Sequence, residues 1–366
     1  MRSSLPCLVL GLFVACNSGA PDPSWTGTGT SWPEADRLFR QDPRWLGGDG
    51  AYSCALGNGR VAWLFGDSFV ANTVGETRTT AKLVRNSVAV QAGPNPVAAN
   101  MTFAWATDGQ AAPSAYFPND GDRWYWPGAC LRLPAGPLAI FLMRQKPATG
   151  GLGFTEDGWR LALIENPDDP PTTWRVAYHD PAVSLFVANV GVAATMDDTH
   201  AYLLATSHGS EHRGHVARIA LGDLVEGKLP ALEWWAQGTW LTLDHVADQP
   251  TNVMDDAGSE ASWHVVSDTW FHFASQGFGA TTIALRTAPA AIGPWSKPVD
   301  VFTPPESQGP NPFVYAGKAH PELETGEGTL AITYATNSFT FADLFTPTGM
   351  DTLYWPRFAR LTLSKR

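Results

Sequence analysis

One pattern recurs along the whole chain: a short apolar segment, a tight polar turn and a second short apolar segment. The turns contain Gly, Pro, Asn or Asp, the residues that tight turns favour, so each repeat predicts a β-hairpin. The five expected strand pairs are 51–56 with 60–66, 129–133 with 138–143, 190–196 with 201–207, 261–267 with 270–275, and 320–323 with 329–336. Successive hairpins begin 59 to 78 residues apart, which leaves room for two more strands after each one. Repeated four-stranded units predict an all-β, five-bladed β-propeller with antiparallel blades; a two-sheet sandwich or a pair of β domains is the alternative.

The composition supports this fold class and excludes others. The 366 residues include 35 Gly, 29 Pro and 16 Trp, but only 16% are charged, which argues against a coiled coil or a helical solenoid. A hydrophobic share of 44% is enough to bury a large core, so the chain is not intrinsically disordered. The net charge of −11 and the absence of a basic stripe in the sequence argue against a nucleic-acid partner.

The amino terminus reads as an export signal rather than as part of the fold. Residues 1–15 carry one charge, Arg2, followed by an apolar stretch that is too short to span a bilayer. The sequence 13–16, Phe-Val-Ala-Cys, resembles a bacterial lipobox, in which the cysteine is acylated after cleavage. We therefore expect a membrane-anchored lipoprotein, periplasmic or on the cell surface, with Cys16 lipidated; plain secretion is the alternative.

The remaining chain divides into a linker and one folded unit. Residues 16–38 are rich in Gly, Ser, Thr and Pro, which is typical of a flexible tether. Residues 39–366 are expected to form a single propeller domain, a monomer that touches the membrane only through its lipid. An exported protein could pair Cys54 with Cys130, but two buried free thiols are an equal alternative.

Polar side chains stand at the open ends of the predicted hairpins. Residues equidistant from a turn face each other, which pairs Asp49 with Asp67, Trp126 with Gln145 beside Arg144, Asn189 with His208, and Glu260 with Gly277 beside Gln276. In the fifth hairpin, His320 and Glu322 lie nearer the turn, deeper in the central channel, with Asn337 at its rim. Because the innermost strands of a propeller run in one direction, we expect these ends to meet at one mouth of the channel.

Carboxylates that converge on a cleft are the machinery of glycoside hydrolysis. One carboxyl must be protonated to release the leaving oxygen, while another must stay ionised to activate water or attack the sugar. The expected catalytic residues are Asp49, Asp67 and Glu260. The expected substrate-binding residues are Trp126, Arg144, Asn86, Asn189, His208, Gln276, Glu322 and Asn337. A structural role is the alternative for each carboxylate: the two aspartates could serve only in turns.

Two stretches of the sequence carry a resemblance. The stretches are residues 45–53, Trp-Leu-Gly-Gly-Asp-Gly-Ala-Tyr-Ser, and residues 62–69, Ala-Trp-Leu-Phe-Gly-Asp-Ser-Phe. They resemble the opening of a family of bacterial five-bladed propeller domains. That family is largely without assigned function and includes endo-D-arabinanases. Residues 293–296, and 320–323 with 334–337, fit the same pattern. More distantly, the chain is similar to the furanosidase propellers of glycoside hydrolase family 43.

The likeness implies roles for individual residues. It makes Asp49 the base or nucleophile and Glu260 the acid. It gives His320 the channel position, beside a water or an ion such as Ca²⁺ or Na⁺; no cofactor is otherwise required. No Asp begins the second or third hairpin, which departs from the family pattern. Asp67 is therefore the substitute for the aspartate that tunes the acid.

Two functions from different classes follow. The first is an extracytoplasmic glycoside hydrolase acting on a furanose-containing, arabinan-like or related polysaccharide. The second is a non-catalytic surface lipoprotein whose propeller binds a glycan or a protein. Two carboxyls about 5–10 Å apart across a cleft favour hydrolysis, whereas carboxyls tied to arginines favour binding. A serine hydrolase lacks support because the sequence has no Gly-x-Ser-x-Gly elbow.

Overall fold

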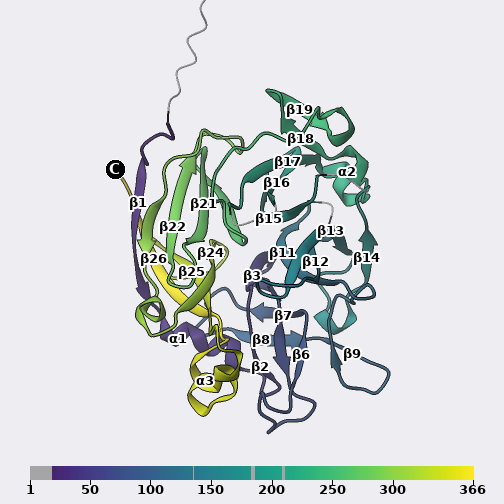
Figure 1. The fold of residues 1–366 in the computed structure, drawn as a ribbon, viewed down its shortest axis with the longest axis vertical. Helices are drawn as coiled ribbons and strands as arrows, with labels where there is room; N and C mark the ends of the chain where they lie inside the picture. The colour runs from purple at the N-terminus through teal and green to yellow at the C-terminus, as the bar shows by residue number, and fades with distance from the viewer. Residues whose placement is uncertain (1–18, 135, 183–185, 208–210) are drawn as a thin grey trace, which may run out of the picture.

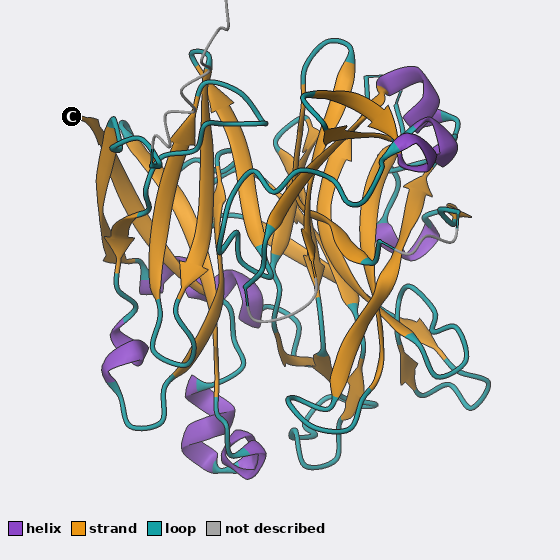
Figure 2. Cartoon of the chain, turned by 45° about the horizontal axis from the view of Figure 1, so that its top comes forward, coloured by secondary structure: helices purple, strands orange, loops and turns teal. Residues whose placement is uncertain are grey.

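Antiparallel β-sheets build almost the whole protein in the computed structural model, which describes residues 19–134, 136–182, 186–207 and 211–366. The expected leader and Cys16 lie outside these residues, as does His208. Most of the short helices lie near the ends of strands, at the periphery of the molecule (Figure 2). No helix in the described ranges is long and apolar enough to cross a membrane.

Five sheets of four or five strands make up most of the described fold (Figure 1). Their strands, in order across each sheet, are β3 (Tyr52–Gly57), β4 (Arg60–Phe65), β7 (Ser87–Ala92) and β8 (Asn100–Ala104); β11 (Trp124–Arg132), β12 (Leu138–Pro147), β13 (Phe154–Ile164) and β14 (Val176–His179); β15 (Ala188–Met196), β16 (His200–Ser207), β17 (Gly214–Ala220), β18 (Glu233–Ala236) and β19 (Thr239–Thr242); β20 (Ala261–Val266), β21 (Thr269–Gln276), β22 (Thr282–Ala288) and β23 (Val299–Phe302); and β24 (Phe313–His320), β25 (Thr329–Asn337), β26 (Arg357–Lys365) and β1 (Trp25–Ser31).

Smaller elements connect these sheets. They are β2 (Trp45–Gly48) with β5 (Ser68–Val70) and β6 (Lys82–Val84), β9 (Ala106–Thr107) with β10 (Pro113–Ser114), and the helices α1 (Pro33–Asp36), α2 (Leu221–Val225) and α3 (Pro347–Thr352). The 3₁₀ helices are η1 (Arg37–Arg40), η2 (Pro171–Thr173), η3 (Leu229–Ala231), η4 (Leu243–His245), η5 (Pro305–Gln308) and η6 (Phe341–Phe345).

The first strands of the five larger sheets contact one another in chain order. β3 contacts β11, β11 contacts β15, β15 contacts β20, and β20 contacts β24. β24 in turn contacts β3, so these strands lie together at the centre of the molecule. The strand that begins each sheet is therefore the one nearest the centre. Side chains at the ends of these strands can come together even though they are far apart in sequence.

The expected tether over 16–38 is wrong in its second half. Residues 25–31 form β1, which pairs antiparallel with β26 at the outer edge of the last sheet (Figure 1). The glycines of this segment serve close packing rather than flexibility: a Cβ at Gly29 would lie 2.7 Å from Cβ of Phe302. The alternating threonines favour an extended strand. The folded unit therefore begins before residue 39.

Cys54 and Cys130 form a disulfide bond between β3 and β11. Both residues are buried in the core, where the first two large sheets meet. The pairing that the sequence leaves open is thus present in the structure. It closes a loop of 76 residues in sequence separation and ties two neighbouring first strands together.

The first hairpin has the expected register, but the second does not. Tyr52 faces Leu64, which continues toward Asp49 and Asp67 as predicted. Gln145, expected opposite Trp126, instead faces Trp124. The third and fourth hairpins depart in the same way, because Asn189 faces Thr206 and Ala261 faces Ala274.

Irregularities within the first strands explain most of these shifts. The pairing slips in β11 between Pro127 and Cys130 and in β15 between Val190 and Ala193. Each slip contains a glycine at a point where neighbouring strands approach closely. A Cβ added to Gly128 would lie 2.5 Å from the Gly191 carbonyl oxygen, and a Cβ added to Gly191 would lie 2.2 Å from Cβ of Phe141. Such bulges cannot be read from the spacing of a turn. In the fourth hairpin the cause is the turn itself, residues 267–268, both with positive φ.

Candidate active site

The first two carboxylates come from the segments that flank the first hairpin. Asp49 follows β2, and Asp67 lies between β4 and β5. The backbone N–H of Asp49 donates to the Asp67 carbonyl at 3.3 Å, and the N–H of Gly66 donates to the Asp49 carbonyl at 3.0 Å. The predicted meeting of the two aspartates is therefore found, and the backbone fixes it.

Tyrosine hydroxyls hold the side chain of Asp49. Its Oδ2 accepts hydrogen bonds from Tyr315 at 2.7 Å and from Tyr354 at 3.2 Å. Within the described residues, no lysine or arginine is bonded to it. Burial, together with the negative charges of Asp67 and Glu260, raises the pKa of Asp49 from 3.8 to about 8. The Asp49 carboxyl is therefore protonated at neutral pH.

Positive and neutral donors hold Asp67 instead. Arg85 donates to its Oδ2 at 3.0 Å, and the indole N–H of Trp126 donates to its Oδ1 at 2.9 Å. Burial raises the pKa of Asp67, while Arg85 and Trp126 oppose that rise. The guanidinium of Arg85 lies 4.2 Å from the ring centre of Trp124, which orients it. Both bonds favour the ionised form of Asp67.

Glu260 contacts Lys318, a residue that the spacing of the hairpins does not predict at the site. Lys318 Nζ lies 3.1 Å from Glu260 Oε1, and only 1% of the lysine side chain is exposed. The same ammonium donates to the Ala316 carbonyl and lies 4.3 Å from the ring centre of Tyr52. Burial lowers the pKa of Lys318, an effect that the charge of Glu260 opposes. The sequence did contain a signal, since Lys318 is a lone charge inside the apolar strand 313–319.

His320 and Glu322 share a hydrogen-bonding partner, Ser53. His320 is 1% exposed; its Nδ1 hydrogen-bonds with Ser53, its Nε2 with Thr333, and the Ser53 hydroxyl also donates to Glu322. Burial lowers the pKa of His320, although Glu322 opposes this. Among the described residues, no group of three or more His, Cys, Asp or Glu side chains could hold a metal ion. Hydroxyls occupy both nitrogens of the ring, so this arrangement does not fit an ion ligand.

Several residues expected to bind substrate lie elsewhere. Asn86 is fully buried and bonds the backbone of Phe117 and Tyr125, which is a structural role. Arg144 donates twice to the Asp157 carbonyl, at 2.7 and 2.9 Å, and forms an ion pair with its side chain. Arg144 lies at an irregularity in the pairing of β12 with β13, between Met143 and Gln145, and Asp157 lies on the facing stretch of β13.

The other candidates divide between core and rim. Gln145 donates to Asn189 at 3.4 Å, and both side chains are buried. Gln276 donates to the Asp256 carbonyl at 3.2 Å in an exposed loop. Asn337 donates to the Tyr315 hydroxyl at 3.4 Å and so belongs to the network around Asp49.

The tyrosines and arginine of the site could not be found from hairpin spacing. Tyr315 lies near the start of β24, Tyr354 follows α3, and Arg85 lies between β6 and β7. Only Tyr315 lies near an open hairpin end: it is two residues inside β24 from Phe313, the residue that faces Asn337.

Comparison with known proteins places the chain in a family. The model of a family described as a domain of unknown function, DUF5005, matches residues 34–363. The chain belongs to this family. No curated protein matches it.

Among solved structures, a Bacteroides ovatus protein classed as a candidate hydrolase superimposes with a TM-score of 0.73, at 21% identity, over 92% of this chain and 90% of that one. The catalytic domain of a family 62 α-L-arabinofuranosidase from Coprinopsis cinerea superimposes with a TM-score of 0.50, at 11% identity, over 94% of this chain and 98% of that one. At these identities the likeness shows the fold, which this DUF5005 member shares with a glycoside hydrolase.

Proposed function

We propose that this protein is a glycoside hydrolase with its catalytic carboxyls at Asp49, Asp67 and Glu260. One observation carries the proposal: Asp67 is bonded to Asp49 through the backbone, and the charges of Asp67 and Glu260 both lie close enough to Asp49 to help raise its pKa to about 8. Acids whose environments separate their protonation states are what acid/base cleavage of a glycosidic bond requires.

The contacts of each carboxyl suggest how the work is divided. Asp49, protonated at neutral pH, donates its proton to the leaving glycosidic oxygen as the bond from that oxygen to the anomeric carbon breaks. Asp67, whose carboxylate accepts hydrogen bonds from Arg85 and Trp126, either takes a proton from the water that attacks the anomeric carbon or attacks that carbon itself. The negative charge of Glu260 helps to keep the proton on Asp49.

This division reverses the roles that the family resemblance implies. The resemblance makes Asp49 the base and Glu260 the acid, but the Glu260 side chain is engaged by Lys318 at 3.1 Å. An acid must carry a proton, and the raised pKa of Asp49 gives it the proton that this role needs. Asp49 lacks such a partner among the described residues.

We also propose that the fold is a five-bladed propeller and that the protein is exported and anchored by a lipid. Five large sheets whose first strands make contact in order, with β24 returning to β3, support five blades. The pairing of β1 with β26 supports closure of the last blade by both ends of the chain. The disulfide between Cys54 and Cys130 supports export to an oxidising compartment, as the expected leader and the lipidation of Cys16 require.

The substrate proposed is a furanose-containing polysaccharide of the arabinan type. The shared fold with a family 62 arabinofuranosidase supports this class. The purified protein should release reducing ends from arabinan, arabinogalactan or xylan. Asp49→Asn and Asp67→Asn should each lower the rate at least about a hundredfold. Asp300→Asn is the matched control, because Asp300 is an exposed carboxylate on the outer strand β23 and should leave the rate unchanged. Full turnover in both site variants would overturn the proposal.

A binding propeller is the second candidate, favoured by the two ion pairs of the site. Arg85 contacts Asp67, and Lys318 contacts Glu260, as expected of carboxyls that hold a structure or a ligand rather than react. The two functions separate in the same assay: a binding protein would retain a glycan on an affinity gel without releasing any reducing ends.

A further inference from the structure

Three phenylalanines form an exposed aromatic cluster close to the carboxylates. Phe278 is 74% exposed and Phe339 is 48% exposed, while Phe313 beside them is half-buried. The rings of Phe313 and Phe339 are nearly parallel, at an interplanar angle of 3° and a centroid distance of 4.4 Å. Phe278 lies 5.4 Å from Phe339 and 6.1 Å from Phe313. We call these three residues the phenylalanine shelf. Contiguous exposed aromatic rings of this kind mark binding surfaces.

The shelf is continuous with the candidate active site. The ring of Phe313 lies 5.0 Å from that of Tyr315, whose hydroxyl donates to Asp49. Asn337 donates to the same hydroxyl from β25. A molecule that covers the shelf therefore lies beside the one held at Asp49.

The shelf is built rather than incidental. The N–H of Val314 donates to the Gly279 carbonyl at 2.9 Å, which ties the loop that carries Phe278 to β24. Gly279 has φ of 80°, and a Cβ there would lie 2.9 Å from the Pro312 carbonyl oxygen and 3.3 Å from the ring of Phe339. Only glycine allows this approach, so the backbone holds the rings in place.

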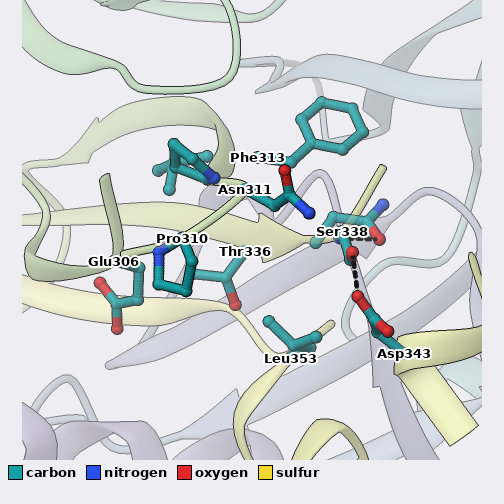
Figure 3. Close-up of a pocket in the computed structure, with 11 residues that line it drawn as sticks. Glu306, Pro310, Asn311, Phe313, Thr336, Ser338, Asp343 and Leu353 are labelled. Carbon is teal, nitrogen blue, oxygen red and sulfur yellow. Dashed lines mark hydrogen bonds between the residues drawn. The ribbon is translucent and has the colours of Figure 1, made fainter. Parts of the chain in front are cut away.

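A polar cavity of about 230 Å³ adjoins the shelf, with Phe313 in its wall (Figure 3). Asn311 and Asn337 line it, as do Ser338 and Asp343, and Ser338 donates a hydrogen bond to Asp343 at 2.7 Å. The cavity is lined by two carboxylates, Asp343 and Glu306, and neither forms an ion pair in the described part of the chain. The lining therefore suits a neutral ligand with hydroxyl groups and disfavours an anion.

We propose that the phenylalanine shelf and this cavity form a second saccharide subsite, which holds the sugar residue adjacent to the one at Asp49. A sugar ring has an apolar C–H face and a polar hydroxyl edge. Aromatic faces beside amides and carboxylates match both. This assignment rests on the proposed function and names where the glycan continues beyond the site of cleavage.

The test separates stacking from general hydrophobic contact. Phe339→Leu keeps an apolar side chain but removes the aromatic face, whereas Phe339→Trp keeps it. On a long arabinan oligosaccharide we expect Phe339→Leu to raise KM about fivefold and Phe339→Trp to keep the wild-type KM. On a short aryl arabinofuranoside, which reaches only the carboxylates, both variants should match the wild type. Phe341→Leu is the control, because Phe341 is 57% exposed and packs on Phe345 rather than on the shelf.

Each other outcome overturns the subsite. Unchanged KM in Phe339→Leu, or an equal loss on long and short substrates, would do so while the proposed function stands. A dimer that Phe339→Leu dissociates, with glycan kinetics unchanged, would assign the shelf to a second copy of the chain. If the wild type cleaves nothing, the proposed hydrolase fails. The subsite is then decided on affinity gels that contain arabinan, arabinogalactan or xylan. Retardation that Phe339→Leu abolishes would support it, and a lack of retardation would overturn it.

Discussion

Replacing Asp49 with Asn should make the protein more stable at neutral pH while it removes the proposed proton donor. Asn keeps an oxygen that can accept from Tyr315 and Tyr354, but it never carries a charge. In the wild type the folded-state pKa of Asp49 is raised from 3.8 to about 8, first by burial and then by Asp67 and Glu260. A raised folded-state pKa means that stability is full below pH 4 and is lost as the pH rises toward 8.

The size of the effect follows from that shift. A pH of 7 is about three units above the ordinary pKa of Asp49. At this pH the residue is ionised in the unfolded chain, whereas it is still protonated in the folded protein. Each unit is worth about 1.4 kcal/mol, which gives an upper bound of about 4 kcal/mol. Because Asp67 lies beside Asp49 and its protonation is linked to that of Asp49, the two share part of this difference, so we expect a gain of about 2 to 4 kcal/mol at pH 7. At pH 3.5 the gain should vanish.

Urea unfolding of wild type and Asp49→Asn at intervals from pH 3.5 to pH 8 measures this difference. Removing any carboxylate lowers the net negative charge of −11, so Asp300→Asn controls for that general effect. A difference between wild type and Asp49→Asn that stays constant with pH, or that matches the control, would refute the electrostatic account of the site.

The remaining predictions concern the groups around the site. Glu260→Gln should lower the free energy of unfolding, measured in urea, by about 3 kcal/mol, because it leaves the buried Lys318 without its partner. Adding Lys318→Met to this variant should recover most of that stability, and no recovery would argue against the pairing. Arg78→Ala should lower the free energy of unfolding by about 3 kcal/mol, since Arg78 is 2% exposed and donates to four backbone carbonyls. A loss of unfolding free energy below about 1 kcal/mol would contradict this. Reducing the disulfide between Cys54 and Cys130, which spans 76 residues, should lower the free energy of unfolding by about 4 kcal/mol. A urea midpoint that dithiothreitol leaves unchanged would exclude this contribution of the disulfide.

Hairpins and their carboxylates were readable from the sequence because both are local. Tyr52 faces Leu64 as the turn predicts, and extending that register brings Asp49 to Asp67. The alternation of apolar residues predicted the strands themselves, and tight-turn residues marked their ends.

Errors arose where strands meet other strands. The slip in β11 contains Gly128, where the backbone of Gly191, in the next sheet, lies too close for a side chain. The Gly-rich segment 25–31 looked like a flexible tether, but it closes the last sheet because β26, more than 300 residues later, offers it an edge. Composition records that glycine is present, whereas its neighbours decide whether it loosens a chain or allows close packing.

The sequence by itself determined an all-β chain of hairpins and the pair of aspartates on the first of them. Tertiary structure decided the chemistry of those acids. Tyr354 donates to Asp49 from 305 residues away, and Lys318 reaches Glu260 from 58 residues away. A pKa depends on burial and on charges in space, and neither is encoded in spacing along the chain. Which acid keeps its proton is therefore a property of the folded molecule alone.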